Sequence, residues 1–277
     1  MSTTSSSRGA EEDLPPFDRE HVLKHTQSPN PSWTYGQKLS ETDKGKAWLA
    51  GEKEGWTVFD PEKEGSRQTY LLLISGVIPR PIAFVSSISE TGVYNLAPFS
   101  WFNTVSSNPP TIVIGCTNLP TRIHDTALNI IATKQFTVNL ISETFIENAN
   151  FTAVDTPIDH SEWPASGLTM ADSVYVKPPR VRESVFSLEC ELSHQVDLSP
   201  AGSSRATSTV LFGLVKRIHV RNDVLNEKGV VNPALYRPVA RLGDISYTTL
   251  GDAFRLPRLA WADVGSDVVE AEEAIRI

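Results

Sequence analysis

Residues 79–103 read Pro-Arg-Pro-Ile-Ala-Phe-Val-Ser-Ser-Ile-Ser-Glu-Thr-Gly-Val-Tyr-Asn-Leu-Ala-Pro-Phe-Ser-Trp-Phe-Asn. The apolar run at 81–89 is rich in residues that favour strands, and residues 94–97 can return beside it as a second strand. The Glu-Thr-Gly at 90–92 is short and contains a glycine, which is typical of a hairpin turn. Because Pro98 has no N–H group to donate to a sheet, we expect the second strand to end or bulge there.

Polar side chains lie among aromatic ones throughout this stretch. In a regular strand Ser86 and Ser87 point to opposite faces, so only one of them can face a ligand directly. An apolar wall with a few hydrogen-bonding groups is what a flat, heteroatom-rich aromatic ligand needs, although each aromatic side chain could instead pack in the core. The residues concerned are Ser86, Ser87, Asn95, Ser100 and Asn103, among Phe99, Trp101 and Phe102.

Two motifs of this stretch, Pro-Arg-Pro-Ile-Ala-Phe-Val-Ser and Asn-Leu-Ala-Pro-Phe-Ser-x-Phe-Asn, resemble the signature of the flavin reductase-like family. Three further segments match in order: Arg-Ile-His-Asp-Thr at 122–126, Phe-Thr-Val-Asn-Leu-Ile at 136–141 and Arg-Leu-Gly-Asp-Ile-Ser-Tyr at 241–247. The likeness covers residues 70–251. It implies a β-rich α+β fold, namely an FMN-binding split β-barrel with short peripheral helices, and a homodimer.

FMN would need a cation and oriented donors for its phosphate. Arg122, His124 and Thr126 stand where a helix is expected to begin, and a helix N-terminus offers free N–H groups and a partial positive charge. Asp125 is unsuited to direct contact with an anion, so we assign it to capping. The alternative for these residues is a solvated loop and an ordinary helix cap.

The isoalloxazine ring would need hydrogen-bonding groups along one edge and apolar faces. The backbone of residues 80–85 can supply edge contacts. Arg241 matches the family's closing motif and could neutralise charge near the flavin or form an ordinary ion pair. The predicted cofactor-binding residues are Arg80, Pro81, Ile82, Ala83, Ser86, Ser87, Asn95, Ala97, Ser100, Trp101, Phe102, Asn103, Arg122, His124, Thr126 and Arg241.

Bulk properties narrow the class of protein. A net charge of −8 over 277 residues argues against a nucleic-acid binder. Cys116 and Cys190 are expected to be reduced core thiols, and the histidines lack metal-ligand spacing. The start of the chain lacks the apolar core of a secretory signal, and no run approaches the ~18 apolar residues that span a bilayer. We therefore expect a cytoplasmic protein that binds neither nucleic acid nor membrane.

The chain divides into four predicted parts. They are a disordered N-terminal tail (1–31), an extension that packs on the barrel (32–69), the flavin reductase-like FMN-binding domain (70–256) and an acidic C-terminal tail (257–277). Helices are expected at 39–51, from Asp125 or Thr126 to Lys134, and at 143–152. Further strands are expected at 111–116, 136–141, 181–196 and 207–220.

Hydride transfer between nicotinamide and flavin needs little acid–base chemistry from the protein, because the cofactor supplies the difficult step. The leading hypothesis is an FMN-dependent oxidoreductase that transfers hydride from NAD(P)H to flavin. The alternatives are an FMN-dependent oxidase or oxygenase acting on a small organic substrate, and a non-catalytic flavin-binding protein. The irregular segment 155–171 could face a substrate, with His160 as the candidate catalytic residue and Trp163 as a stacking surface.

Overall fold

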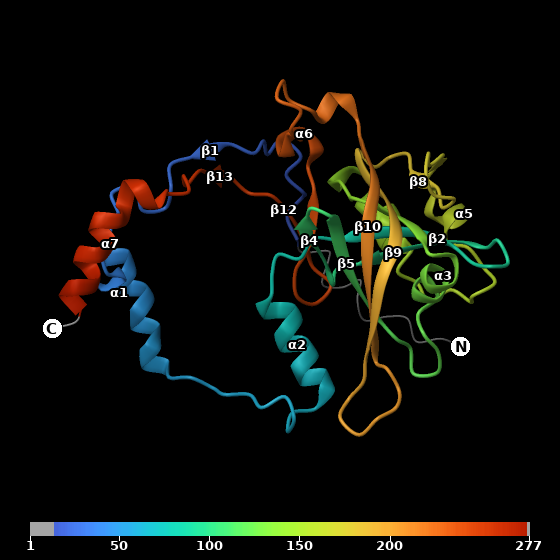
Figure 1. The fold of residues 1–277 in the computed structure, drawn as a ribbon, viewed down its shortest axis with the longest axis horizontal. Helices are drawn as coiled ribbons and strands as arrows, with labels where there is room; N and C mark the ends of the chain where they lie inside the picture. The colour runs from blue at the N-terminus through green and yellow to red at the C-terminus, as the bar shows by residue number, and fades with distance from the viewer. Residues whose placement is uncertain (1–13, 276–277) are drawn as a thin grey trace.

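The computed structural model describes residues 14–275, which are built around a seven-stranded antiparallel sheet (Figure 1). The strand order is β3-β2-β6-β9-β10-β5-β4. These strands are β2 (Ala83–Ile88), β3 (Tyr94–Phe99), β4 (Phe102–Ser107), β5 (Pro110–Thr117), β6 (Gln135–Asn139), β9 (Phe186–Leu198) and β10 (Ser208–Val220). The mixed fold with a large antiparallel sheet agrees with the sequence. Closure into a barrel does not, because the edge strands β3 and β4 are not hydrogen-bonded to each other in the described residues.

The predicted hairpin is the β2–β3 pair, with Ala83 opposite Phe99 and Ile88 opposite Tyr94. Strand β3 continues through Pro98 to Phe99 without a register shift, which corrects the expectation that it ends or bulges there. The reason is the position of β3 at the edge of the sheet. An edge strand directs alternate N–H groups away from its neighbour, so a residue without an N–H group is tolerated.

Two apolar cores lie on the two faces of the sheet, because successive residues of a strand point to opposite sides. One core contains Ala83, Val85, Ala97, Phe99 and Phe136, and helix α3 (Asp125–Thr133) packs on it. The other contains Ile82, Phe84, Leu96 and Trp163, covered by α4 (Ile146–Phe151) and α5 (Trp163–Ser166).

The two cysteines lie in the first core as free thiols. Burial raises the pKa of Cys116 to about 12 and also raises the pKa of Cys190. Both thiols therefore stay protonated at neutral pH, which confirms the prediction of buried, reduced cysteines.

Shorter elements complete the described chain, and the part that runs from 14 to 275 has no helix long and apolar enough to cross a membrane. The remaining helices are α1 (Asp43–Leu49), α2 (Ser66–Gly76), α6 (Pro233–Tyr236) and α7 (Trp261–Ile275). Short 3-10 helices lie at Leu39–Glu41, Ala50–Glu54, Glu143–Phe145 and Asn222–Val224. The paired short strands are β1 (His25–Thr26) with β13 (Ala253–Phe254), β7 (Met170–Ala171) with β8 (Arg180–Val181), and β11 (Val239–Arg241) with β12 (Tyr247–Thr249).

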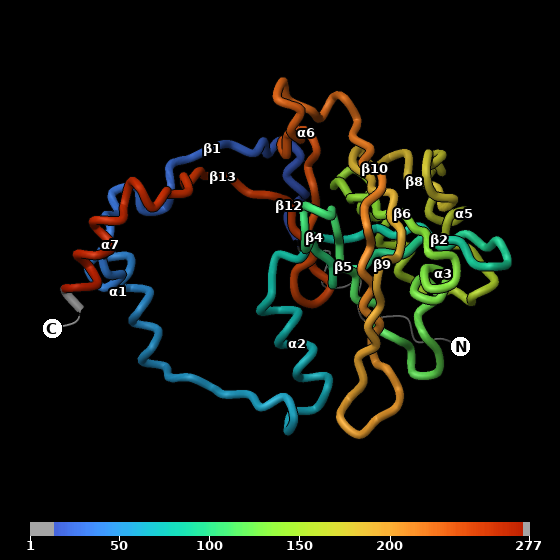
Figure 2. Tube along the Cα trace, in the orientation of Figure 1, coloured from blue at the N-terminus to red at the C-terminus, as the bar shows by residue number. Residues whose placement is uncertain are grey.

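The two terminal segments leave the sheet together and form an arm, which we define as residues 25–60 and 253–275 (Figures 1 and 2). Strands β1 and β13 pair in parallel at its base, and α1 and α7 lie at its far end. The extension 32–69 was expected to pack on the barrel; within it, Trp48 and Trp56 are 79% and 84% exposed. The acidic C-terminal segment contains the helix α7.

Residues 14–31 correct the prediction of a disordered tail, whose first thirteen residues lie outside the described ones. The Ala253 N–H donates to the Lys24 carbonyl at 2.8 Å, and the Lys24 N–H donates to Asp252 Oδ1 at 3.1 Å. Arg237 Nη2 donates to the Arg19 carbonyl at 3.1 Å. Hydrogen bonds to the C-terminal part of the chain, which lies far away in sequence, thus hold this segment in place.

Candidate functional site

Arg80, the second residue of the motif that begins at Pro79, lies buried shortly after the end of helix α2. Its guanidinium donates to the carbonyl of Ile74, to that of Val77 at 3.0 Å and to that of Leu242 at 2.9 Å. The last carbonyls of a helix have no partner within the helix and attract cations. Burial and the nearby charge of Arg241 lower the pKa of Arg80. The side chain therefore fixes α2 against the segment after β11.

A cavity of about 190 Å³, which we call the Arg80 cavity, opens beside this arginine. Four of the predicted cofactor-binding residues line it: Arg80, Ile82, Ser100 and Arg241. Tyr247 also lines it, and the guanidinium carbon of Arg241 lies 4.4 Å from the centroid of the Tyr247 ring. Two guanidinium groups, a serine hydroxyl and apolar side chains give the mixed lining expected for a planar, heteroatom-rich ligand.

A buried polar network occupies several other predicted residues. Thr126 Oγ1 donates to Asn95 Oδ1 at 2.7 Å, and Ser87 Oγ donates to the same oxygen at 3.3 Å. Asn129 Nδ2 donates to Ser87 Oγ at 3.1 Å. The side chains of Ser87, Asn95 and Thr126 thus bond to one another beneath the surface. Neither Ser86 nor Ser87 reaches the surface, and the Ser86 hydroxyl has no hydrogen-bond partner among residues 14–275.

Glu162 completes this network, and the sequence did not single it out. Its Oε2 accepts hydrogen bonds from the Leu96 N–H at 3.0 Å and from Asn95 Nδ2 at 3.3 Å, although the residue is only 4% exposed. Burial raises the pKa of Glu162. No local signal distinguishes it in the sequence, because Asp155 and Asp159 precede it in the same polar stretch.

Helix α3 begins at Asp125, with His124 as its N-cap. The Thr126 N–H donates to Asp125 Oδ1 at 2.9 Å and to His124 Nδ1 at 3.3 Å. Burial raises the pKa of Asp125, but its hydrogen bond to His124 and the charge of Arg122 outweigh this effect, so the net shift is downward. His124 meets Phe99 edge to face with ring centroids 5.1 Å apart. This contact brings the motif at 122–126 against the hairpin.

Arg122 has a guanidinium nitrogen without a partner. Its Nη2 pairs with Asp155 Oδ1 at 2.9 Å, whereas Nη1 is buried and bonded to nothing in the described residues. Buried donors are almost always satisfied in folded proteins. The unsatisfied Nη1 at the start of a nine-residue helix therefore fits an anionic ligand.

The predicted cofactor-binding residues thus fall into separate groups. The Arg80 cavity lies on the face of the β2–β3 hairpin that carries Ile82, whereas His124 contacts Phe99 on the opposite face. Ala83 and Ala97 are core residues, and Phe102 packs against the same core. Pro81 is half-buried, and Trp101 and Asn103 are exposed near the start of β4.

The segment 155–171 presents different side chains from those expected. His160 is exposed, pairs with Asp159 at 2.9 Å and is not among the residues lining the Arg80 cavity. Trp163 is only 3% exposed and belongs to the second core, so its ring offers no open stacking surface. From this segment, Glu162 hydrogen-bonds to the hairpin, and Trp163 packs in the core that the hairpin helps to form.

Comparison with known proteins shows which family this chain is related to. Residues 75–240 match the model of the flavin reductase like domain. The chain is 38% identical over 179 residues to an uncharacterized protein of Aquifex aeolicus, which covers 64% of this chain and 88% of that protein. It is similar to nitrilotriacetate monooxygenase component B from Bacillus cereus, at 33% identity and a TM-score of 0.70, over 73% of this chain and 99% of that one. It is also similar to the 2-nitrobenzoate 2-nitroreductase of Pseudomonas fluorescens, at 30% identity and a TM-score of 0.65, over 74% of this chain and 98% of that one. The chain belongs to the flavin reductase-like domain family.

Proposed function

We propose that this protein is an FMN-dependent oxidoreductase that transfers hydride from NAD(P)H to bound flavin. The observation that carries the proposal is the buried, unpartnered Nη1 of Arg122 at the start of α3, in a chain of the flavin reductase-like family. A phosphate would satisfy this donor and would also be favoured by the helix dipole. FMN, when bound, supplies the hydride chemistry itself.

In this proposal the residues of the chain bind and orient rather than transfer protons. Arg122, in the segment just before α3, holds the phosphate. Ser100 and Arg241 contact the polar edge of the ring system, while Ile82 and Tyr247 supply apolar surface. Ala153 lines the Arg80 cavity and Asp155 pairs with Arg122, so FMN would extend from one face of the hairpin to the other past the edge strand β3. Arg80 acts mainly by positioning α2, because its donors are already bonded to carbonyl groups.

A second candidate function is suggested by the two solved relatives, whose names refer to a monooxygenase component and to a nitroreductase. An FMN-dependent enzyme acting on a small organic substrate would use the same cofactor site. The third candidate, a flavin-binding protein without turnover, differs from both by the absence of any electron transfer.

The test has a binding step and a reduction step. Calorimetric titration should show FMN binding to the full chain, and Arg122→Ala should weaken it by about 1.5–3 kcal/mol, the range for hydrogen bonds to charged groups. Arg221→Ala is the matched control, because Arg221 also pairs with an aspartate, Asp223, at 2.7 Å but lies at the end of β10. Equal affinities for FMN in all three proteins would remove Arg122 from the site.

Anaerobic mixing with NADH and with NADPH then separates the three candidates. Loss of the oxidised-flavin absorbance, faster than for free FMN, is the result expected of a reductase. If FMN binds but neither nucleotide bleaches it, hydride transfer from NAD(P)H is wrong and the second or third candidate holds.

A further inference from the structure

A second cavity, of about 760 Å³, lies beside the Arg80 cavity. Asn150 and Tyr247 line both cavities, and the Tyr247 hydroxyl donates to Asn150 Oδ1 at 2.7 Å. The floor of the second cavity comes from β11 and β12, and one side comes from α4 and the turn before it. A side-chain hydrogen bond therefore forms part of the boundary between the two spaces.

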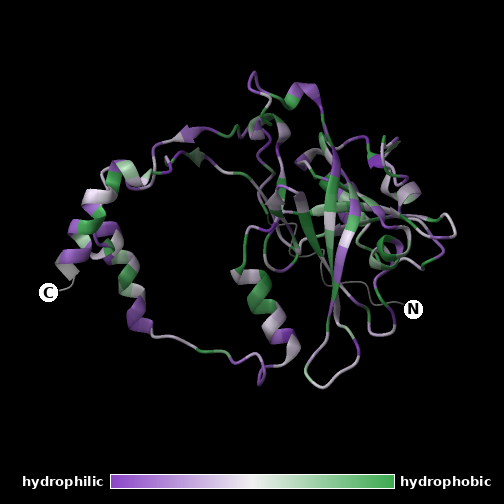
Figure 3. Cartoon of the chain, viewed as in Figure 1, coloured by the Kyte–Doolittle hydropathy of each residue, from purple (hydrophilic) through white to green (hydrophobic). Residues whose placement is uncertain are grey.

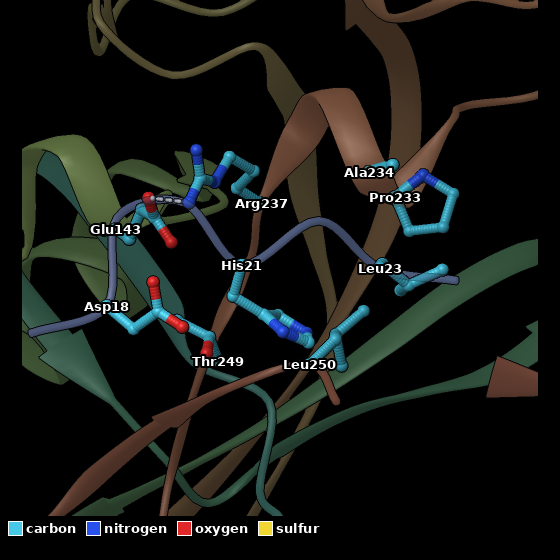
Figure 4. A pocket seen from close by; sticks show the side chains of 9 residues that line it. All are labelled: Asp18, His21, Leu23, Glu143, Pro233, Ala234, Arg237, Thr249 and Leu250. Atoms are coloured by element: carbon cyan, nitrogen blue, oxygen red, sulfur yellow. Dashed lines mark ion pairs between the residues drawn. The ribbon is translucent and has the colours of Figure 1, made fainter. Parts of the chain in front are cut away.

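The other side of this cavity is formed by residues 17–24, which we call the strap. Phe17 and Arg19 of the strap line the second cavity. Asp18, His21 and Leu23 instead point into a small neighbouring hollow between α6 and β12 (Figure 4). Neighbouring residues of the strap thus face either the second cavity or the small hollow, as expected for an extended segment that lies on a surface.

The strap is fastened near both of its ends. Arg237 Nη2 donates to the Arg19 carbonyl at 3.1 Å and pairs with Glu143 Oε1 at 2.7 Å, so one nitrogen joins the strap to the wall of the cavity. At the other end, Lys24 bonds through its backbone to Ala253 and Asp252. The strap lies outside residues 75–240, which match the family model. It closes one side of a cavity whose other lining residues lie at 143–151 and 239–249.

The chemistry of the lining selects a class of ligand. Phe17, Phe151 and Tyr247 present aromatic rings, and the first two are about half exposed. The charge of Glu143 is compensated by Arg237. The other charged lining residues are Arg19 and Glu147, which carry opposite charges and form no ion pair within the described part of the chain. The lining is thus aromatic and close to neutral in sum, which suits an uncharged ring compound better than an ion.

We propose that the second cavity is the binding site for the organic substrate of the enzyme, a flat and uncharged ring compound, and that Phe17 of the strap forms one of its walls. The substrate role rests on the second candidate of the proposed function, an enzyme acting on a small organic substrate, because it requires flavin in the neighbouring Arg80 cavity. The binding site itself rests on the strap, the rings and the volume. A ligand between Phe17 and Phe151 covers apolar surface that is otherwise in contact with water.

The experiment uses the full chain and 4-fluoronitrobenzene as the probe, observed by ¹⁹F NMR titration with and without FMN. Phe17→Ala and Phe151→Ala should each raise the dissociation constant about five- to tenfold, which corresponds to the partial loss of one ring contact. Phe59→Ala is the matched control, since Phe59 is an exposed phenylalanine of the arm that lines neither cavity. The anion 4-fluorobenzoate should bind more weakly than the uncharged probe.

Each outcome decides one of the two proposals. A probe affinity that is the same in Phe17→Ala as in Phe59→Ala overturns the assignment of the strap, and stronger binding of 4-fluorobenzoate overturns the ligand class. FMN affinity, titrated separately, should be unchanged in both cavity variants. If the protein binds no FMN while probe binding still depends on Phe17, the proposed function fails and the binding site stands. Circular dichroism of each variant confirms that the fold is retained, and Phe17→Leu offers a milder change at the same position.

Discussion

Glu162 shows at the scale of one residue how the hairpin and its surroundings are joined. A buried carboxylate is costly unless its hydrogen bonds compensate for lost water. Here one oxygen, Oε2, accepts both from the Leu96 N–H and from Asn95 Nδ2. Asn95 in turn accepts from Thr126 at the start of α3. One acid thereby connects the start of α5 with β3 and, through Asn95, with α3.

Substitutions at Glu162 should separate its hydrogen bonds from its charge. Glu162→Gln can place its carbonyl oxygen where Oε2 lies, so we expect a free energy of unfolding within about 1 kcal/mol of wild type. Glu162→Ala leaves two buried donors unpaired and should cost about 2–4 kcal/mol. Urea unfolding measures both, with the exposed Glu227→Ala as control. A loss in the Gln variant as large as that in the Ala variant would show that the negative charge is required.

Comparing wild type with Glu162→Gln also gives the direction in which the free energy of unfolding changes with pH. The pKa of Glu162 is raised in the folded state, so the folded protein holds this proton more tightly than the unfolded chain does. Its contribution is most favourable below the unfolded glutamate pKa of about 4.3 and declines as pH rises toward the raised folded value. Relative to Glu162→Gln, wild type should therefore lose stability between acid and neutral pH. A gain over that interval would contradict the burial argument.

At the scale of elements, local patterns were enough for the hairpin and most strands. The runs at 111–116, 136–141 and 207–220 became β5, β6 and β10, because alternation and β-branched residues act locally. Helix α2 was not predicted, since its Tyr-Leu-Leu-Leu-Ile run at 70–74 is apolar on all sides and lacks a helical period (Figure 3). The order of the sheet could not be read either, because β10 pairs with β5 across ninety residues of sequence.

The site was predictable as a set of residue types but not as a set of roles. Ser87, Asn95 and Thr126 were recognised as polar and assigned to a ligand, whereas each finds a partner on another element. In the Thr126–Asn95 and Asn129–Ser87 hydrogen bonds, the two residues lie more than thirty positions apart in the sequence. No local sequence pattern can therefore predict them. Arg80, Ile82, Ser100 and Arg241 were brought together as expected, and only the fold could show that Arg80 is occupied by helix carbonyls.

Helix α2 should depend on Arg80. A lysine ammonium is a compact charge and cannot match the fork that reaches the carbonyls of Ile74, Val77 and Leu242 together. Arg80→Lys should therefore speed amide hydrogen exchange in α2 about tenfold or more, as expected for a loss of at least about 1.4 kcal/mol of local stability. Arg67→Lys, near the exposed start of the same helix, is the control. Equal protection in all three proteins would mean that α2 is held by other contacts.

At the scale of the whole molecule, large apolar side chains are exposed on elements outside the seven-stranded sheet. The arm exposes Trp48, Trp56 and, at 67%, Trp261, and α2 exposes Tyr70, Leu71 and Leu73. Large exposed patches of this kind mark interaction surfaces in soluble proteins. We propose that a second copy of the chain covers these exposed side chains. The arm extends away from its own sheet, and α2 forms only one wall of the Arg80 cavity.

A homodimer held by the arm should be visible in its mass. Light scattering at micromolar concentration should give twice the 30.5 kDa chain mass. Replacing Trp48 and Trp56 by serine together should shift the protein toward the monomer, since burying each ring is worth roughly 1.5–3 kcal/mol. Leu198→Ser, an exposed apolar residue at the β9–β10 hairpin, should leave the mass unchanged. A monomeric wild type with bound FMN would contradict the dimer, whereas a double variant that stays dimeric would place the interface on α2 and the sheet, because the arm would then contribute nothing to association.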